Sequence, residues 1–174
     1  MNSRQQKQQS HEKNCGDLLL NLLDEECWTY VRHGNEIDEP DLIYKKNSGN
    51  TLGIEVTVAY RNNLFAEDIW NIISNLKKGN KYFNKLQIGP PEAHLIDMVN
   101  SINNRLMDKC SNTSYNIKPF TKVYLCIYLF SPIFDETDLE KCLKKIQVPI
   151  KSKFKNIFLL LQDNGGKFLY QKIQ

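Results

Sequence analysis

The stretch EPDLIY, residues 39–44, is followed after a polar turn by LGIEVT, residues 52–57, and these two runs decide the fold. Each run is short and strand-like, and each places one acidic residue, Asp41 or Glu55, among apolar neighbours. If the runs pair as a hairpin, Asp41 lies opposite Glu55 or Val56, where cross-strand Cβ atoms are roughly 5 Å apart. Two carboxylates at that separation repel each other unless a proton or a cation lies between them. The pairing therefore predicts a site for a divalent metal ion.

The side chains of the second run alternate between two faces, because successive residues of a strand point to opposite sides of the sheet. Its apolar residues can pack on a helix, which leaves Glu55 and Thr57 toward a polar cleft. Hard cations prefer carboxylate oxygens, backbone carbonyls and water. Asp41, Glu55 and the backbone carbonyl of Val56 are thus the predicted ligands of Mg²⁺ (or Mn²⁺).

The periodicity of the chain predicts helices and strands in the order α-β-β-β-α-α-β-α-β-β. The predicted segments are a helix from Glu12, strands at 27–31, 41–45 and 52–59, helices over 62–79 and from Pro91, a strand at 123–130, a helix from Thr137 and a final hairpin around 164–166. Residues 1–10 are predicted to be a disordered polar tail, and residues 11–174 to form a single domain. The order predicts an α/β fold in which helices flank a mixed central sheet.

The composition is that of a globular protein and does not by itself indicate a partner. The 174 residues are 41% hydrophobic, which is enough for a core, and the formal net charge of +3 is too small to predict nucleic-acid binding. Lysines nevertheless cluster at 77–85 and at 141–155, and the second cluster contains no acid. Such clusters can follow a phosphate backbone or form a solvated surface, and both interpretations stay open here.

The cysteines and the N-terminus indicate the expected compartment. Five cysteines are widely spaced, and no pair of Cys or His residues has the spacing of zinc ligands. The polar N-terminus lacks the apolar region of a signal peptide, and no run approaches the roughly 20 apolar residues that a membrane span needs. We therefore expect a reducing, cytoplasmic location and no membrane partner. The tyrosine-rich segment 123–130 is interpreted as core instead of a surface that stacks bases.

A glutamate in the first helix (Glu12), a strand, the pair Pro40-Asp41, a hairpin and Glu55 within an apolar strand follow one another along the chain. This order resembles the PD-(D/E)xK nuclease superfamily, whose restriction-endonuclease-like αβββαβ core corresponds to residues 12–130, with the last helix and hairpin as additions. The resemblance implies that Asp41 is the motif aspartate, Glu55 the second acid and Glu12 the helix glutamate. It also implies a magnesium-dependent endonuclease that hydrolyses phosphodiester bonds of nucleic acid, with DNA as the expected substrate.

Position 57 departs from the family pattern, which places a lysine two residues after the second acid, where this chain has Thr57. In the family that lysine orients the attacking water and stabilises the charge of the phosphate. Lys45 shares the face of Asp41 but lies about 13 Å farther along the strand, too far to replace it. Lys77 or Lys78 in the following helix can lean over the site, or Thr57 can position a water itself.

The candidate catalytic residues are therefore Glu12, Asp41, Glu55 and Thr57, and each acid also has a structural explanation. Asp41 can form a local turn hydrogen bond, Glu55 can lie on an exposed sheet face, and Glu12 can stabilise a helix N-terminus. The missing lysine favours, as an alternative, a catalytically degenerate module that binds nucleic acid or a partner protein. A small interaction protein without a nucleic-acid role is a third hypothesis, and cleavage of both strands of DNA would favour a homodimer.

Overall fold

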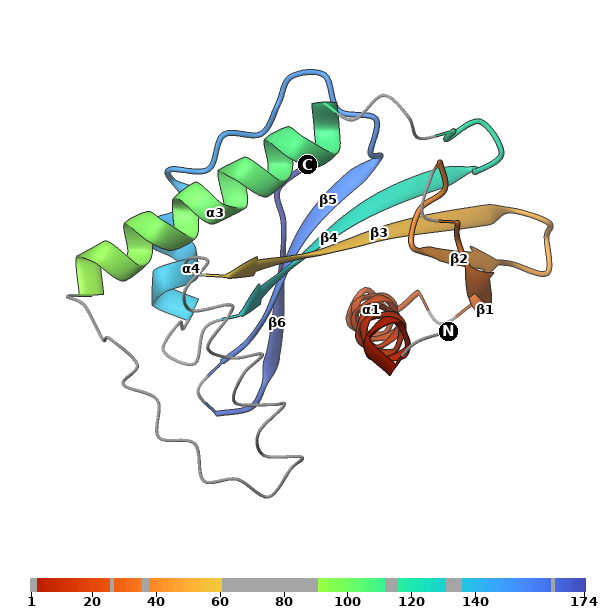
Figure 1. Ribbon diagram of the computed structural model, residues 1–174, viewed down its shortest axis with the longest axis horizontal. Helices are drawn as coiled ribbons and strands as arrows, with labels where there is room; N and C mark the ends of the chain where they lie inside the picture. Colours follow the sequence, from red (N-terminus) through yellow and green to blue (C-terminus); the bar gives the residue numbers. More distant parts are fainter. Residues whose placement is uncertain are drawn as a thin grey trace.

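The computed structural model describes residues 3–25, 27–35, 38–60, 91–111, 116–130, 136–163 and 165–174. The helix predicted over 62–79 and the lysine cluster at 77–85 lie outside the described residues. Helices and strands carry the labels of Figure 1.

Six strands of the described residues form one open, mixed sheet in the order β1-β2-β3-β4-β5-β6. They are β1 (Thr29–His33), β2 (Leu42–Lys45), β3 (Thr51–Tyr60), β4 (Lys122–Phe130), β5 (Asn156–Gln162) and β6 (Phe168–Lys172). The strands β1, β2 and β3 are antiparallel neighbours, β3, β4 and β5 run parallel, and β6 returns antiparallel to β5. The predicted α/β architecture, a mixed sheet flanked by helices, is confirmed.

Helices cover both faces of this sheet (Figure 1). Helix α1 (Ser3–Leu22) lies on one face, and α3 (Pro91–Ser111) and α4 (Glu136–Leu143) lie on the other. Successive side chains of β3, β4 and β5 point to opposite faces of the sheet, and so they contribute to two separate hydrophobic cores. The core under α1 includes Cys15, Leu19, Leu52, Ile54, Val56, Cys126 and Leu160, and the core under α3 includes Ile102, Leu106, Leu125, Ile127 and Leu159. Strand β4 is therefore buried on both faces, as its unbroken apolar run predicts.

The hairpin of β2 and β3 has the register on which the predicted site depends. Leu42 pairs with Ile54 and Lys45 pairs with Thr51. Gly49 closes the turn with φ of 90°, a backbone conformation that glycine adopts without steric cost. The register continued by one residue places Asp41 across from Glu55, which is one of the two pairings predicted from the sequence.

Helix α1 begins at Ser3, which corrects the predicted start at Glu12. Gln and Lys are good helix formers, so this polar segment can extend the apolar part of the helix by two turns. The extension is also tied down, because Nε2 of His33 in β1 lies 2.9 Å from the backbone oxygen of Gln9. Among the described helices, none combines the length and apolar character that crossing a membrane requires.

Candidate functional site

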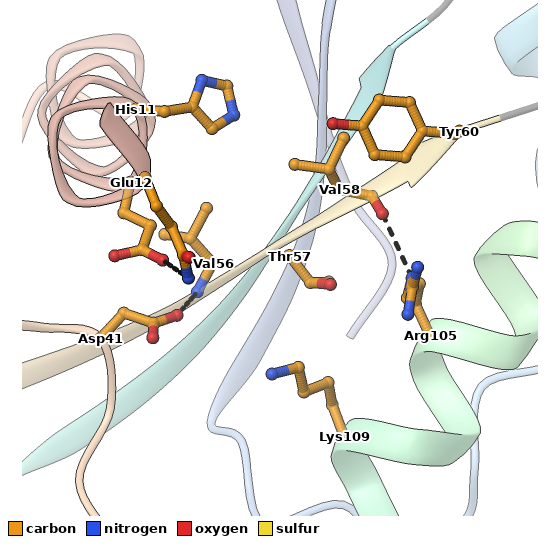
Figure 2. Close-up of a pocket in the computed structure, with 10 residues that line it drawn as sticks. His11, Glu12, Asp41, Val56, Thr57, Val58, Tyr60, Arg105 and Lys109 are labelled. Carbon is orange, nitrogen blue, oxygen red and sulfur yellow. Dashed lines mark hydrogen bonds between the residues drawn. The ribbon is translucent and has the colours of Figure 1, made fainter. Parts of the chain in front are cut away.

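Two close backbone approaches hold the Pro40-Asp41 pair in place. The backbone N–H of Gly34 donates to the backbone oxygen of Asp41 at 3.0 Å. On the other side, a Cβ atom added to Gly53 would lie only 2.5 Å from Cγ of Pro40. Glycine at position 53 therefore lets Pro40 pack directly on β3. The Asp41 side chain is fixed in turn, because its Oδ2 accepts a hydrogen bond from the backbone N–H of Val56 at 2.8 Å (Figure 2).

The edge of β3 beyond this point supplies backbone oxygens to the site. Within the described residues, β2 pairs with β3 only as far as Leu42 opposite Ile54. The N–H and C=O of one strand residue point to the same side, so the Val56 carbonyl lies along the edge that Asp41 occupies. Two residues later, the Val58 carbonyl on this edge accepts a hydrogen bond from Nε of Arg105 at 3.2 Å (Figure 2).

Glu55 lies on the α3 face of β3 and is only 1% exposed. Its Oε1 forms an ion pair with Nζ of Lys109, in the last turn of α3. A second lysine, Lys153, lies near the same carboxylate. Burial lowers the pKa of the Lys153 ammonium, and the negative charge of Glu55 partly offsets that lowering. A lysine that α3 contributes thus lies beside the buried acid, whereas position 57 itself carries a threonine.

A pocket of about 340 Å³ opens between α1, the free edge of β3 and α3. Ten residues line it: Gln8, His11, Glu12, Asp41, Val56, Thr57, Val58, Tyr60, Arg105 and Lys109. Four of the five predicted site residues are in this set. The fifth, Glu55, does not line the pocket, but it forms an ion pair with Lys109, which does. Glu12 faces inward as its place on the helix stripe predicts, is 8% exposed, and accepts a hydrogen bond from Nε2 of Gln8 at 2.9 Å.

The three acids Glu12, Asp41 and Glu55 are close enough for their charges to affect the pKa of Asp41. Burial, together with the negative charges of Glu55 and Glu12, raises the pKa of Asp41 to about 8. The hydrogen bond from Val56 and the positive charge of Lys109 act against this rise and do not cancel it. Near neutral pH the Asp41 carboxyl therefore retains its proton in most molecules, and a cation in the pocket would favour its release.

The donor set bears directly on the predicted metal. In the described part of the chain, no group of three or more His, Cys, Asp and Glu side chains is arranged to hold a metal ion. A hard cation would instead meet two carboxylates, Asp41 and Glu55, and the Val56 carbonyl, with Lys109 withdrawn from Glu55. These are oxygen ligands of the type that Mg²⁺ accepts. Burial is the main reason that the pKa of Asp41 is raised, and the charges of Glu55 and Glu12, which a cation would neutralise, add to it.

The main residues that the sequence reasoning missed are Arg105 and Lys109. They are four apart on α3, and each follows a buried stripe residue by three positions, Ile102 and Leu106 respectively. This spacing places both cations beside the apolar stripe of the helix, which was a usable signal. Lys45 is exposed at the far end of β2, as expected, and Lys77 and Lys78 lie outside the described residues.

Comparison with known proteins adds little to this geometry. No family model matches the chain, and no curated protein matches it. The solved structure of Pyrococcus furiosus SfsA in complex with Ca²⁺ is similar to this chain with a TM-score of 0.31 and 11% sequence identity. The similarity covers 95% of this chain and 62% of the SfsA chain, so this chain spans less than two thirds of that protein. A similarity of this size carries no functional argument.

Proposed function

We propose that this protein is a metal-dependent nuclease that hydrolyses phosphodiester bonds of nucleic acid, with DNA as the expected substrate. One observation carries the proposal. The hairpin brings Asp41 beside the Val56 backbone and Glu55 behind it, and α3 adds Lys109 to Glu55. Two acids and a lysine around one strand edge are the functional groups of a PD-(D/E)xK site, although the lysine comes from a different element.

The pocket would hold Mg²⁺ or Mn²⁺ through Asp41, Glu55 and the Val56 carbonyl. A bound divalent ion would supply a water of lowered pKa and a positive charge next to the scissile phosphate. Asp41 loses its proton when the ion binds, so affinity for the ion rises with pH toward about 8. Glu12, on the opposite wall, is placed to accept hydrogen bonds from water bound at the ion.

A divalent ion held beside Glu55 would weaken the Lys109–Glu55 ion pair, and Lys109 would then be available to the phosphate. Released from its ion pair, the ammonium at the end of this flexible side chain can reach into the pocket that it already lines. There it stabilises the negative charge that develops on the phosphate oxygens, as preorganised cations do in phosphoryl transfer. Arg105 lies one turn earlier on α3 and already spans to the β3 edge, which keeps a second positive charge beside the substrate.

The second lysine cluster fits a role in holding the phosphate backbone. The described side chains in this cluster are mostly exposed: Lys141, Lys144, Lys145, Lys151 and Lys155. Lys153 belongs to the same run and is near Glu55, which connects the cluster to the site. Binding through such contacts weakens as salt rises, because each neutralised phosphate releases a counterion.

The test is cleavage of labelled single-stranded, double-stranded and branched DNA, and of RNA, in Mg²⁺, Mn²⁺ or EDTA. We expect cutting that requires the metal and is lost in Asp41→Asn and Glu55→Gln, which preserve side-chain shape. Lys45→Met, an exposed lysine at the far end of β2 and outside both the pocket and the second lysine cluster, is the matched control and retains cutting. Cleavage that survives EDTA, or survives both substitutions, contradicts the proposal.

The alternative is a catalytically degenerate module that binds nucleic acid or a partner protein. The observation in its favour is the Lys109–Glu55 ion pair itself, because an internal cation already balances the buried carboxylate. Calorimetry with Mn²⁺ separates the two. Heat of binding that disappears in Asp41→Asn supports the nuclease, whereas no Mn²⁺ binding together with intact DNA binding supports the degenerate module.

A further inference from the structure

Aromatic rings continue from the pocket along the α1 face of the sheet. His11 lies edge-on to Tyr128 with ring centroids 5.5 Å apart, Tyr128 lies 6.2 Å from Phe130, and Phe130 lies 5.9 Å from Tyr60. The two end members of this aromatic row, His11 and Tyr60, also line the pocket. All four residues are half-buried.

The row comes from three different elements that meet at one end of the sheet. His11 is on α1, Tyr60 ends β3, and Tyr128 and Phe130 lie at the end of β4. Because β3 and β4 are parallel, their carboxyl ends meet at the same edge, where Tyr60 pairs in register with Phe130. Most of segment 123–130 is core, as predicted, and its last two aromatic residues, Tyr128 and Phe130, are half-buried.

Figure 2 shows how the rings stand relative to the acidic part of the site. His11 and Tyr60 are drawn on one side of β3, and Arg105 and Lys109 on the other, with Val58 between the two rings. Tyr60 is four residues beyond Val56, which is about 13 Å along an extended strand. A phosphate near Asp41 and a base that contacts the pocket-facing sides of His11 and Tyr60 would therefore belong to the same short stretch of one strand.

We propose that the pocket takes single-stranded DNA and stacks an unpaired base against His11 and Tyr60, beside the phosphate held at the acids. This inference rests on the proposed function and names its substrate class. Aromatic side chains next to a positively charged groove are the usual way to bind unpaired bases without reading their sequence. A pocket of about 340 Å³ lies at the small end of ligand pockets, and it matches a nucleotide better than a paired duplex.

The charge of His11 agrees with a stacking role. Burial lowers the pKa of the His11 imidazole, so the ring is neutral at neutral pH and can lie against a base without carrying a charge into the pocket. The groups that face the ring include Tyr128 and the Cys15 thiol, whose Sγ is 3.6 Å from Nε2 of His11. Burial raises the pKa of that thiol to about 12, so it too is uncharged.

The experiment measures binding in EDTA, where metal-dependent cutting does not interfere. The probe is a short single-stranded oligonucleotide with one fluorescent 2-aminopurine, compared with the same sequence as a duplex. We expect the parent protein to bind the single strand more tightly and to quench its fluorescence. Tyr60→Leu should weaken single-strand binding by about tenfold and abolish the quenching, whereas Tyr60→Phe keeps both. Tyr170→Leu, an exposed aromatic residue on β6, is the matched control and changes neither.

Equal or tighter binding of the duplex, with no effect of Tyr60→Leu on either probe, would overturn the inference. Failure of the proposed function is visible separately, because it requires metal-dependent cleavage that Asp41→Asn removes. Stacking without any cleavage would therefore overturn the nuclease proposal and support the stacking site. Cleavage restricted to duplex DNA would support the nuclease proposal and overturn the stacking site.

Discussion

The two halves of β3 differ in their strand pairing and in the polar side chains that contact them. The first half, Thr51–Ile54, pairs with β2 on one side and β4 on the other, and its Leu52 and Ile54 are fully buried. The second half, from Glu55 to Tyr60, pairs with β4 and presents its other edge to Asp41 and Arg105. One strand thus supplies a rigid support and, directly after it, the open edge on which polar chemistry is built. The end of β2 at Leu42 creates the difference.

The largest effect on stability should come from the buried half. Ile54→Ala removes a fully buried side chain between α1 and the sheet, and we expect the free energy of unfolding to fall by about 2–5 kcal/mol. Thr57→Ala, three residues later and half-buried in the pocket, should change it by less than about 1 kcal/mol. Urea unfolding of both variants gives the comparison. Similar losses of unfolding free energy in the two variants would contradict a difference in stability between the first and second halves of β3.

A smaller loss should follow removal of the cation from the buried acid. Lys109→Met leaves the Glu55 carboxylate, 1% exposed, without that counter-charge, and we expect a loss of about 1–3 kcal/mol. Adding Glu55→Gln should recover most of the loss, since the neutral amide needs no cation. The measurement is a double-mutant cycle by urea unfolding. If the two single losses simply add, the ion pair is not a coupled element of the site.

A third stability effect expected is a pH dependence centred on Asp41. Its carboxyl has a pKa of about 8 in the folded protein and an ordinary value of 3.8 when unfolded. The folded state therefore holds the proton more tightly, and this contribution to stability is full below about pH 4 and is lost as pH rises through about 8. Asp41→Asn should be more stable than the parent at pH 9, by about 1 kcal/mol or more.

That advantage of Asp41→Asn should shrink as the pH falls toward 5, where the parent carboxyl is protonated. Chemical denaturation of the two proteins side by side at several pH values gives the difference directly, and groups common to both cancel. Addition of Mn²⁺ at pH 8 should stabilise the parent and not the variant, because a ligand of the folded state raises its stability. A pH-independent difference between the proteins would show that Asp41 is not held in the field of Glu12 and Glu55.

Sequence reasoning reached the sheet and the acids because both depend on local patterns. The alternation in β3, the unbroken apolar run of β4 and the turn at Gly49 each follow from side-chain period or backbone freedom. The hairpin predicted Asp41 opposite Glu55 or Val56, and the observed register selects Glu55. The adjacency of the two acids was therefore predictable from residues 39–57 alone.

Long-range contacts were harder to predict. Lys109 contacts Glu55, 54 positions away in the sequence. His11 in α1 contacts Tyr128 in β4, which is also far away along the chain. Both contacts depend on how a helix lies on the sheet, which periodicity does not fix. The start of α1 was missed for a related reason: a polar segment with good helix formers reads as disordered until its contact with β1 is known.

We propose that Lys109, which α3 brings to the site, takes the role of the lysine that the motif would place at position 57. The test removes the amino group from position 109 and then introduces one at position 57. Single-turnover cleavage in Mn²⁺ should be slowed by about 100-fold or more in Lys109→Met, which corresponds to about 3 kcal/mol of lost transition-state stabilisation. Adding Thr57→Lys to Lys109→Met should restore much of the rate, since Thr57 lines the same pocket. Lys109→Met that cuts as fast as the parent, or a double variant as slow as the single one, would contradict the account.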